Sequence, residues 1–126
     1  MSMALILIVE DHEKNRKLVR DVLQFKGYRI IEAETAEEGL RLARAQHPAL
    51  ILMDIQLPGM NGIEALAILR GDPQTANIPV IAVTASAMTQ ERDKIMAAGF
   101  DAYQRKPLAI KEFLALVQHT LEAARP

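Results

Sequence analysis

The sequence contains no cysteine, has no large excess of either charge and lacks any long hydrophobic run. Without cysteine the chain forms no disulfides and has no thiol chemistry, which suits the cytoplasm. Its 15 basic and 16 acidic side chains give a formal charge of −1, which offers no footprint for nucleic acid or anionic lipid. No apolar run approaches the roughly 18 residues of a membrane span, and we find no signal peptide. We therefore expect a small cytoplasmic domain with no nucleic-acid partner and no membrane span.

Strand and helix patterns alternate five times along the chain. Short apolar runs and amphipathic segments predict strands over 4–9, 28–33, 50–54, 79–84 and 101–105 and helices over about 13–26, 35–47, 62–70, 89–98 and 109–123. The connections favour buried parallel strands with helices on both faces. We therefore predict an α/β fold: a single (βα)₅ domain over residues 1–126, with a doubly wound, flavodoxin-like five-stranded parallel sheet in the order 2-1-3-4-5.

Two of the predicted helices gather apolar side chains on one face, and we expect these faces to point into the core. In the helix over 13–26 the apolar arc consists of Leu18, Val19, Val22, Leu23 and Phe25. In the helix over 109–123 it consists of Ile110, Phe113, Leu114, Val117 and Leu121.

Charged and polar side chains stand where the predicted strands end. Glu10 and Asp11 follow the first strand, and Asp54 ends the third. Thr84 ends the fourth strand and Lys106 follows the fifth. Ligands of open parallel sheets bind beyond the carboxyl ends of the strands, near the switch point. We therefore expect three carboxylates, a hydroxyl and an ammonium at one rim, with the second strand at the sheet edge, away from the site.

Neighbouring carboxylates repel one another and raise one another's pKa, and a divalent cation removes this repulsion. Mg²⁺ takes oxygen ligands and commonly joins carboxylates to a phosphate. Asp54 would then be the nucleophile that forms an aspartyl-phosphate, with Lys106 neutralising charge and Thr84 donating its hydroxyl to a phosphoryl oxygen. The sequence therefore predicts a Mg²⁺ site and phosphoryl transfer to Asp54.

Each of these residues taken alone has a simpler structural interpretation. Asp11 could cap the first helix, and Asp54 could form an Asx turn. Thr84 could be a satisfied buried hydroxyl, and Lys106 a solvated surface ammonium. Their joint appearance at the ends of four strands favours the chemical site.

Four segments resemble the motifs of the receiver domains of response regulators, the phosphoacceptor proteins of two-component signalling. They are ILIVED at 6–11, LILMDIQLPGMNG at 50–62, PVIAVTA at 79–85 and YQRKP at 103–107. The resemblance extends over about residues 4–121. It implies an aspartyl-phosphate formed with a phosphoryl group from a histidine kinase or histidine phosphotransferase.

The resemblance also implies how the metal and the phosphoryl group are held. Asp54 would be the phosphoacceptor and a Mg²⁺ ligand. Asp11 would ligate Mg²⁺ directly, Glu10 through water, and Gln56 through its main-chain carbonyl. The acidic pair is Glu-Asp instead of Asp-Asp, a mild departure that is common in the family and would leave Mg²⁺ binding intact.

The resemblance implies that further residues take part in the conformational change that follows phosphorylation. Thr84 and Lys106 match the switch hydroxyl and the phosphate-contacting lysine. Tyr103 matches an aromatic that turns inward when Thr84 moves, the alternative being an edge aromatic that only covers apolar surface. The bond before Pro107 would be cis. Gln56 and Ser86, two residues past Asp54 and Thr84, stand where the family varies and tunes dephosphorylation.

Receivers of this family signal through the face of helix four, strand five and helix five. We expect Leu116, Ala109 and the helix around 92–96 to contribute to a partner surface, with Leu116 as core margin the alternative. The basic residues Lys14, Arg16 and Lys17 are expected on a solvated helix face, with contact to an incoming kinase as the alternative.

The chain ends after the fifth helix and resembles a stand-alone receiver with no output domain. The segments LILMDIQLP and IPVIAVTASAM are similar to those of regulators of cell division, so phosphorylation would regulate partner proteins in that process. The protein would not be an enzyme, although it would assist its own phosphorylation and dephosphorylation.

Three other functions are compatible with parts of the pattern. A receiver-like docking module would act without phosphorylation, although the intact set of site residues argues against it. A flavodoxin-like cofactor binder needs amides and hydroxyls after the first strand, where EDHEKN offers carboxylates. An aspartyl-phosphate phosphatase needs a second acid close to Asp54, which Asp-Ile-Gln lacks.

Overall fold

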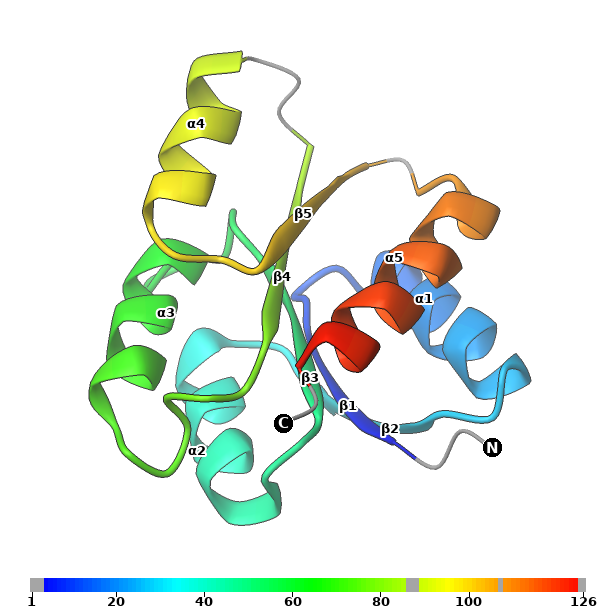
Figure 1. Cartoon of the computed structure of the whole chain (residues 1–126), viewed down its shortest axis with the longest axis horizontal. Helices are drawn as coiled ribbons and strands as arrows, with labels where there is room; N and C mark the ends of the chain where they lie inside the picture. The colour runs from blue at the N-terminus through cyan, green and yellow to red at the C-terminus, as the bar shows by residue number, and fades with distance from the viewer. Residues whose placement is uncertain (1–3, 86–88, 107, 125–126) are drawn as a thin grey trace.

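A computed structural model describes residues 4–85, 89–106 and 108–124 of the chain. Strands and helices alternate throughout (Figure 1). The strands are β1 (Leu5–Val9), β2 (Arg29–Ala33), β3 (Leu50–Asp54), β4 (Val80–Thr84) and β5 (Ala102–Arg105). The helices are α1 (Glu13–Phe25), α2 (Ala36–Gln46), α3 (Gly62–Gly71), α4 (Thr89–Ala97) and α5 (Ile110–Ala123).

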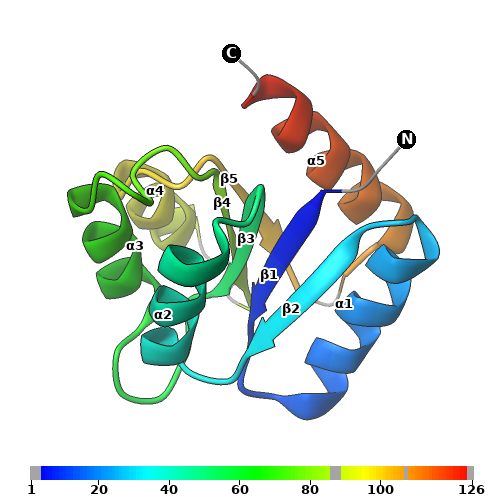
Figure 2. The same cartoon turned by 90° about the horizontal axis from the view of Figure 1, so that it is seen from below.

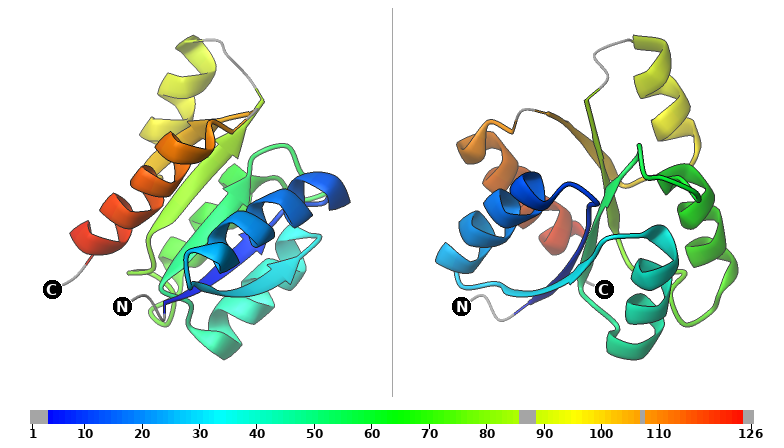
Figure 3. Two further views of the ribbon diagram at one scale, coloured as in Figure 1. Left: turned by 90° about the vertical axis from the view of Figure 1, so that its right-hand side faces the viewer. Right: turned by 180° about the vertical axis from the view of Figure 1, so that it is seen from behind.

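The five strands form one sheet in the order β2-β1-β3-β4-β5, and every neighbouring pair is parallel. Helices α1 and α5 cover one face, and α2, α3 and α4 cover the other (Figures 1 and 2). The views from the side and from behind show the same three layers (Figure 3). The predicted doubly wound α/β fold and its strand order are therefore confirmed.

The central strands are apolar up to their last residues because both of their faces are buried. In β1, Ile6 and Ile8 join the core beneath α1 and α5, whereas Leu7 and Val9 join the core beneath α2, α3 and α4. Successive side chains of a strand point to opposite faces, so a continuous apolar run fills two cores at once. β2 lies at one edge of the sheet, as expected, and β5 lies at the other.

The apolar arcs of α1 and α5 are narrower in the structure than the sequence predicts. Val19 and Leu23 of α1 are buried, but Leu18 is 45% exposed and Phe25 is 88% exposed. In α5, Ile110 is 46% exposed. Apolar periodicity marks the side of a helix that faces the sheet, whereas the width of the contact depends on how the helix lies across the strands. Positions at the margin of the arc or in a terminal turn therefore reach solvent.

No helix in the part of the chain that the structure describes has both the length and the apolar character needed to span a membrane.

The first turn of α3 lies directly against the end of β3, and a glycine makes this approach possible. A Cβ atom added at Gly62 would lie 2.6 Å from the main-chain oxygen of Asp54 and 3.0 Å from the Cα atom of Ile55. The Gly62 N–H also donates to the carbonyl of Ile55 at 3.1 Å. The backbone that follows Asp54 is thus held in place by the start of α3.

We predict that Gly62→Ala lowers the free energy of unfolding by about 1–3 kcal/mol, because the added methyl group meets backbone atoms that cannot easily move. Gly71→Ala is the matched control in the same helix, since nothing lies within 4 Å of a Cβ there. This control should be neutral or stabilising by up to about 1 kcal/mol. Urea unfolding monitored by circular dichroism measures both variants, and equal effects would contradict the close-approach argument.

Candidate functional site

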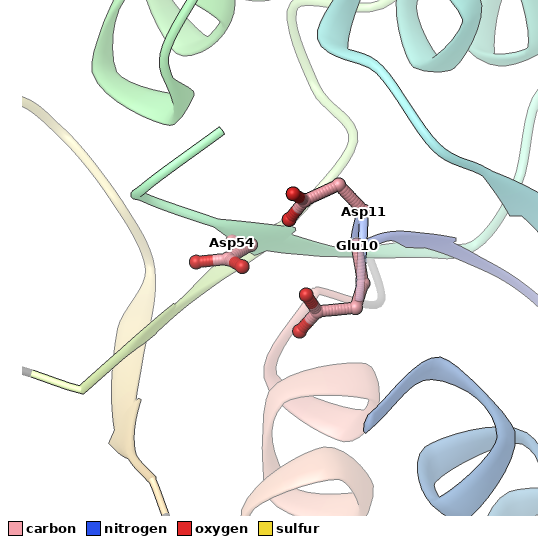
Figure 4. A group of neighbouring side chains, drawn as sticks. All are labelled: Glu10, Asp11 and Asp54. Atoms are coloured by element: carbon pink, nitrogen blue, oxygen red, sulfur yellow. The ribbon is translucent and has the colours of Figure 1, made fainter. Parts of the chain in front are cut away.

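The three carboxylates predicted to lie together do so at the carboxyl edge of the sheet. β1 and β3 are neighbours with Val9 opposite Met53, so the next residue of each strand, Glu10 and Asp54, lies at the same level. Asp11 follows Glu10. One oxygen of each of the three carboxylates lies within 4.8 Å of the others. Figure 4 shows the three side chains converging from the ends of the two strands.

One ammonium group pairs with the two buried carboxylates. Glu10 and Asp54 are 5% and 4% exposed. The Nζ atom of Lys106 donates to Glu10 Oε1 at 2.8 Å and to Asp54 Oδ2 at 3.1 Å. Buried charges of one sign are tolerated only when they are paired and hydrogen-bonded. Lys106 therefore compensates both acids, and it is not the freely solvated ammonium of the simpler interpretation.

Main-chain amides satisfy the remaining oxygens of the buried pair. Glu10 Oε2 accepts from the His12 N–H at 3.0 Å, and Asp54 Oδ1 accepts from the Gln56 N–H at 3.0 Å. The second bond is the Asx-type contact considered for Asp54 from the sequence. Asp54 therefore forms the turn and the ion pair at the same time.

Asp11 differs from its two neighbours in being exposed to solvent. Helix α1 begins after His12 and has no side-chain cap, so Asp11 does not serve as the helix cap. Its carboxylate forms no hydrogen bond or ion pair within the described ranges. The site thus has two buried acids and one acid with free oxygens at its mouth.

The environment moves the pKa values of Glu10 and Lys106 upward. Burial raises the pKa of Glu10, and its contacts with Lys106 and the His12 amide offset this only in part. Burial alone would lower the pKa of Lys106, but the hydrogen bond to Glu10 and the charge of Asp54 outweigh it and raise that pKa above 10.5. Burial therefore disfavours the charged form of Glu10, whereas the neighbouring acids favour the charged form of Lys106.

The other predicted site residues lie on the adjoining strands. Thr84 ends β4 and is 1% exposed, and its main-chain carbonyl accepts from the Lys106 N–H at 2.8 Å. Tyr103 of β5 is partly buried and packs against the core beneath α2, α3 and α4. It covers apolar surface here, as in its simpler interpretation, so its part in a switch stays a prediction. The side chain of Gln56 is exposed.

Two further predictions lie outside the described residues. These are the cis bond before Pro107 and the tuning position Ser86.

The residues predicted to form a partner surface are partly buried in some cases and exposed in others. Leu116 is partly buried and packs against the core beneath α1 and α5, in agreement with its alternative as core margin. Ala109 and Arg92 are exposed, and Met96 is 43% exposed. Ile95, which lies between Arg92 and Met96 in the sequence, is fully buried.

Sequence reasoning missed a pair of residues beside the acidic cluster. Arg16 was expected to face solvent, but its side chain is only 13% exposed. Its Nε donates to Glu32 Oε1 of β2 at 3.1 Å, and its NH1 donates to the main-chain carbonyl of Glu10 at 3.0 Å. The only acid of the strand RIIEA, partly buried Glu32, was the available signal, since a buried acid needs a cationic partner.

Comparison with known proteins decides what kind of domain carries this site. Residues 6–118 match the response regulator receiver domain. The chain belongs to this family. The predicted resemblance to response-regulator receiver domains is thus confirmed over most of the chain.

Among named relatives, the receiver is 44% identical over 116 residues to the polar-differentiation response regulator DivK of Brucella ovis. This alignment covers 92% of the chain and 94% of the relative. The DivK of Brucella anthropi is 43% identical over the same extent. The likeness that the segments LILMDIQLP and IPVIAVTASAM indicate is therefore confirmed as a likeness to DivK.

Solved receivers share the fold closely. The receiver domain of a sensor histidine kinase from Pseudomonas aeruginosa PAO1 superposes with a TM-score of 0.88 at 30% identity, covering 95% of the chain and 98% of that structure. That structure has a magnesium ion coordinated in its active site cleft. A CheY-like receiver from Methanospirillum hungatei JF-1 gives 0.88 at 31% identity, covering 97% and 96%.

We predict that Lys106→Met lowers the free energy of unfolding by roughly 2 to 4 kcal/mol in metal-free buffer at neutral pH, because Glu10 and Asp54 lose their shared counter-charge. The Lys106 contribution is fully present below pH 10.5 and is lost only as the pH rises through the raised pKa of the folded state. Adding Mg²⁺ should raise the melting temperature of the variant more than that of the wild type.

Lys17→Met is the control for this experiment, because Lys17 pairs with Asp21 on the solvated surface at 2.7 Å and exposed pairs contribute little. Differential scanning calorimetry with and without Mg²⁺ measures both variants. A Lys106→Met protein as stable as the control would show that the buried acids do not depend on Lys106.

Proposed function

We propose that this receiver is a response regulator that accepts a phosphoryl group on Asp54 with the aid of Mg²⁺. The observation that carries the proposal is the convergence of Glu10, Asp11 and Asp54 at the carboxyl edge of the sheet, with Lys106 bridging the two buried acids. The donor would be a phosphohistidine of a histidine kinase or histidine phosphotransferase.

The acidic cluster fits Mg²⁺ by its chemistry. All three side chains offer hard carboxylate oxygens, and the exposed Asp11 keeps its oxygens open for a ligand. Asp11 and Asp54 would bind the ion directly, Glu10 through water, and Gln56 through its main-chain carbonyl. Bound there, Mg²⁺ supplies positive charge toward the oxygens of the incoming phosphoryl group.

In the transfer step, a carboxylate oxygen of Asp54 attacks phosphorus as the bond from phosphorus to the imidazole nitrogen breaks. The electron pair of the broken bond goes to the imidazole, which takes a proton from solvent, and the product is an acyl phosphate on Asp54. Lys106 already contacts Asp54 at 3.1 Å, so its ammonium lies within reach of the transferred charge. Asp54 is held in orientation by the Gln56 amide.

The response to phosphorylation would begin at Thr84. Its hydroxyl would donate to a phosphoryl oxygen, and Tyr103 would change its packing in turn. Thr84 and the Lys106 N–H are already joined through the main chain, which couples the end of β4 to the residue that follows β5. The altered surface would be the face of α4, β5 and α5, including Ala109, with Leu116 at its margin.

The partner would be a protein that distinguishes the phosphorylated from the unphosphorylated face. The relatives named polar-differentiation response regulators support a role in cell differentiation and division. As in receivers generally, the chain would assist its own phosphorylation and the hydrolysis of its acyl phosphate, without acting as an enzyme on another substrate.

We predict that incubation with acetyl phosphate adds one phosphoryl group to the wild-type protein in the presence of Mg²⁺ and none in its absence. Asp54→Asn should gain no adduct, because an amide is a far poorer nucleophile than a carboxylate. Asp93→Asn is the control and should be phosphorylated normally, since Asp93 is exposed on α4. Intact-protein mass spectrometry reads all three.

An adduct that survives in Asp54→Asn would place the phosphoryl group elsewhere and overturn the assignment. No adduct from acetyl phosphate or from a phosphorylated histidine phosphotransferase would favour the docking module that acts without phosphorylation.

We also predict that Asp11→Asn weakens Mg²⁺ binding by at least about tenfold while leaving the melting temperature of the metal-free protein nearly unchanged. Metal affinity and stability should respond differently because Asp11 is exposed and has no partner among the residues described. Asp93→Asn should change neither quantity. Isothermal titration calorimetry and a thermal melt decide the matter, and Mg²⁺ affinity equal to that of the wild type would remove Asp11 from the site.

A further inference from the structure

The guanidinium of Arg16 ties three parts of the chain together beside the acidic cluster. It projects from α1, donates through Nε to Glu32 of β2 at 3.1 Å, and donates through NH1 to the main-chain carbonyl of Glu10 at 3.0 Å. With 13% exposure, this arginine is built into the structure and is not a solvated surface charge.

The carbonyl that Arg16 holds belongs to the peptide linking Glu10 to Asp11. On the other side of Glu10, its N–H donates to the carbonyl of Ala33 at 3.0 Å. Glu10 is therefore fixed through its N–H by β2, through its carboxylate by Lys106, and through its carbonyl by Arg16. Asp11 has no side-chain partner of its own in the described part of the chain, so its position depends on this peptide.

We propose that Arg16 is a positioning residue for the metal site: its bond to the Glu10 carbonyl, braced by Glu32, sets the direction in which Asp11 leaves β1. The inference rests on the proposed Mg²⁺-dependent function and adds to it a residue that touches neither the metal nor the phosphoryl group. Arg16 acts by restricting the rotation of the Glu10–Asp11 peptide, whose carbonyl it holds.

A charge effect and a positioning effect predict opposite changes in Mg²⁺ affinity when Arg16 is replaced. The guanidinium is a positive charge close to a cation site, so deleting it should by charge alone tighten Mg²⁺ binding. Loss of the bond to the Glu10 carbonyl should loosen the turn and weaken binding. The sign of the change therefore distinguishes a positioning role from a simple charge effect.

Arg20 provides a matched control on the same helix. Its NH1 donates to the same carboxylate, that of Glu32, at 3.0 and 3.1 Å, but it has no contact with Glu10. Arg20→Gln therefore removes the same charge and one partner of Glu32 while leaving the bond to the turn. Arg16→Lys keeps the charge but loses the planar fork that reaches two acceptors at once.

The experiment measures Mg²⁺ affinity of the whole chain by isothermal titration calorimetry for wild type, Arg16→Gln, Arg16→Lys and Arg20→Gln, with a thermal melt of each to show that it is folded. We expect Arg16→Gln to bind about tenfold or more weakly, in the range seen when a supporting hydrogen bond near a metal site is lost. Arg16→Lys should recover only part of the loss, and Arg20→Gln should bind within about twofold of wild type.

A second readout uses the metal-free protein. The His12 amide donates to Glu10 Oε2 within the turn that Arg16 holds. Hydrogen exchange at this amide should be faster in Arg16→Gln and unchanged in Arg20→Gln. A role of Arg16 in global stability alone would speed exchange throughout the sheet by the same factor.

Three outcomes would overturn the inference. Arg16→Gln could bind Mg²⁺ as tightly as wild type or more tightly, Arg20→Gln could lose as much affinity as Arg16→Gln, or exchange at His12 could stay unchanged. A wild-type chain that binds no Mg²⁺ and accepts no phosphoryl group would instead overturn the proposed function, and the role of Arg16 with it.

Discussion

Two buried carboxylates that share one ammonium are the constraint on which the rest of the site depends. Glu10 follows β1 and Asp54 ends the neighbouring β3, so the topology of the sheet brings them together, and Lys106 is the group that makes their burial tolerable. With Asp11 included, three carboxylates face one ammonium and leave two negative charges when all are ionised. A divalent cation matches this excess, whereas a second lysine would not.

Much of the fold follows from the pattern of the sequence because each local signal agrees with the others. Apolar runs such as LILM fill two cores at once, as expected of a strand buried on both faces, and the polar residues that follow the strands meet at one edge. The three carboxylates and Lys106 could be placed together on this argument alone. Leu18 and Phe25 could not be placed, because helical periodicity does not say how far around a helix the sheet reaches.

The contribution of β2 to the site was the main feature that the pattern did not reveal. The edge strand β2 contributes no side chain to the acidic cluster itself, yet Glu32 accepts a hydrogen bond from Arg16, and the carbonyl of Ala33 accepts one from the Glu10 N–H. Such contacts join residues whose separation in sequence has no fixed period, so only the folded chain displays them. The switch at Thr84 and Tyr103 stays a prediction, because a switch is a difference between two states and neither the sequence pattern nor one structure contains both.

The large separation in sequence between Lys106 and its two partners has a consequence for the folding of the chain. Its partners lie 96 and 52 residues earlier in the chain, so the ion pairs close some of the longest loops in the molecule. Long-range contacts of this kind form only after the entropy of loop closure has been overcome. A chain still emerging from the ribosome, or one whose last strand has come loose, has its two acids but no ammonium between them. If Asp54 accepts the phosphoryl group as proposed, competence to receive a signal arrives only once the final strand has joined the sheet, and a nascent or partly unfolded copy is silent in the pathway.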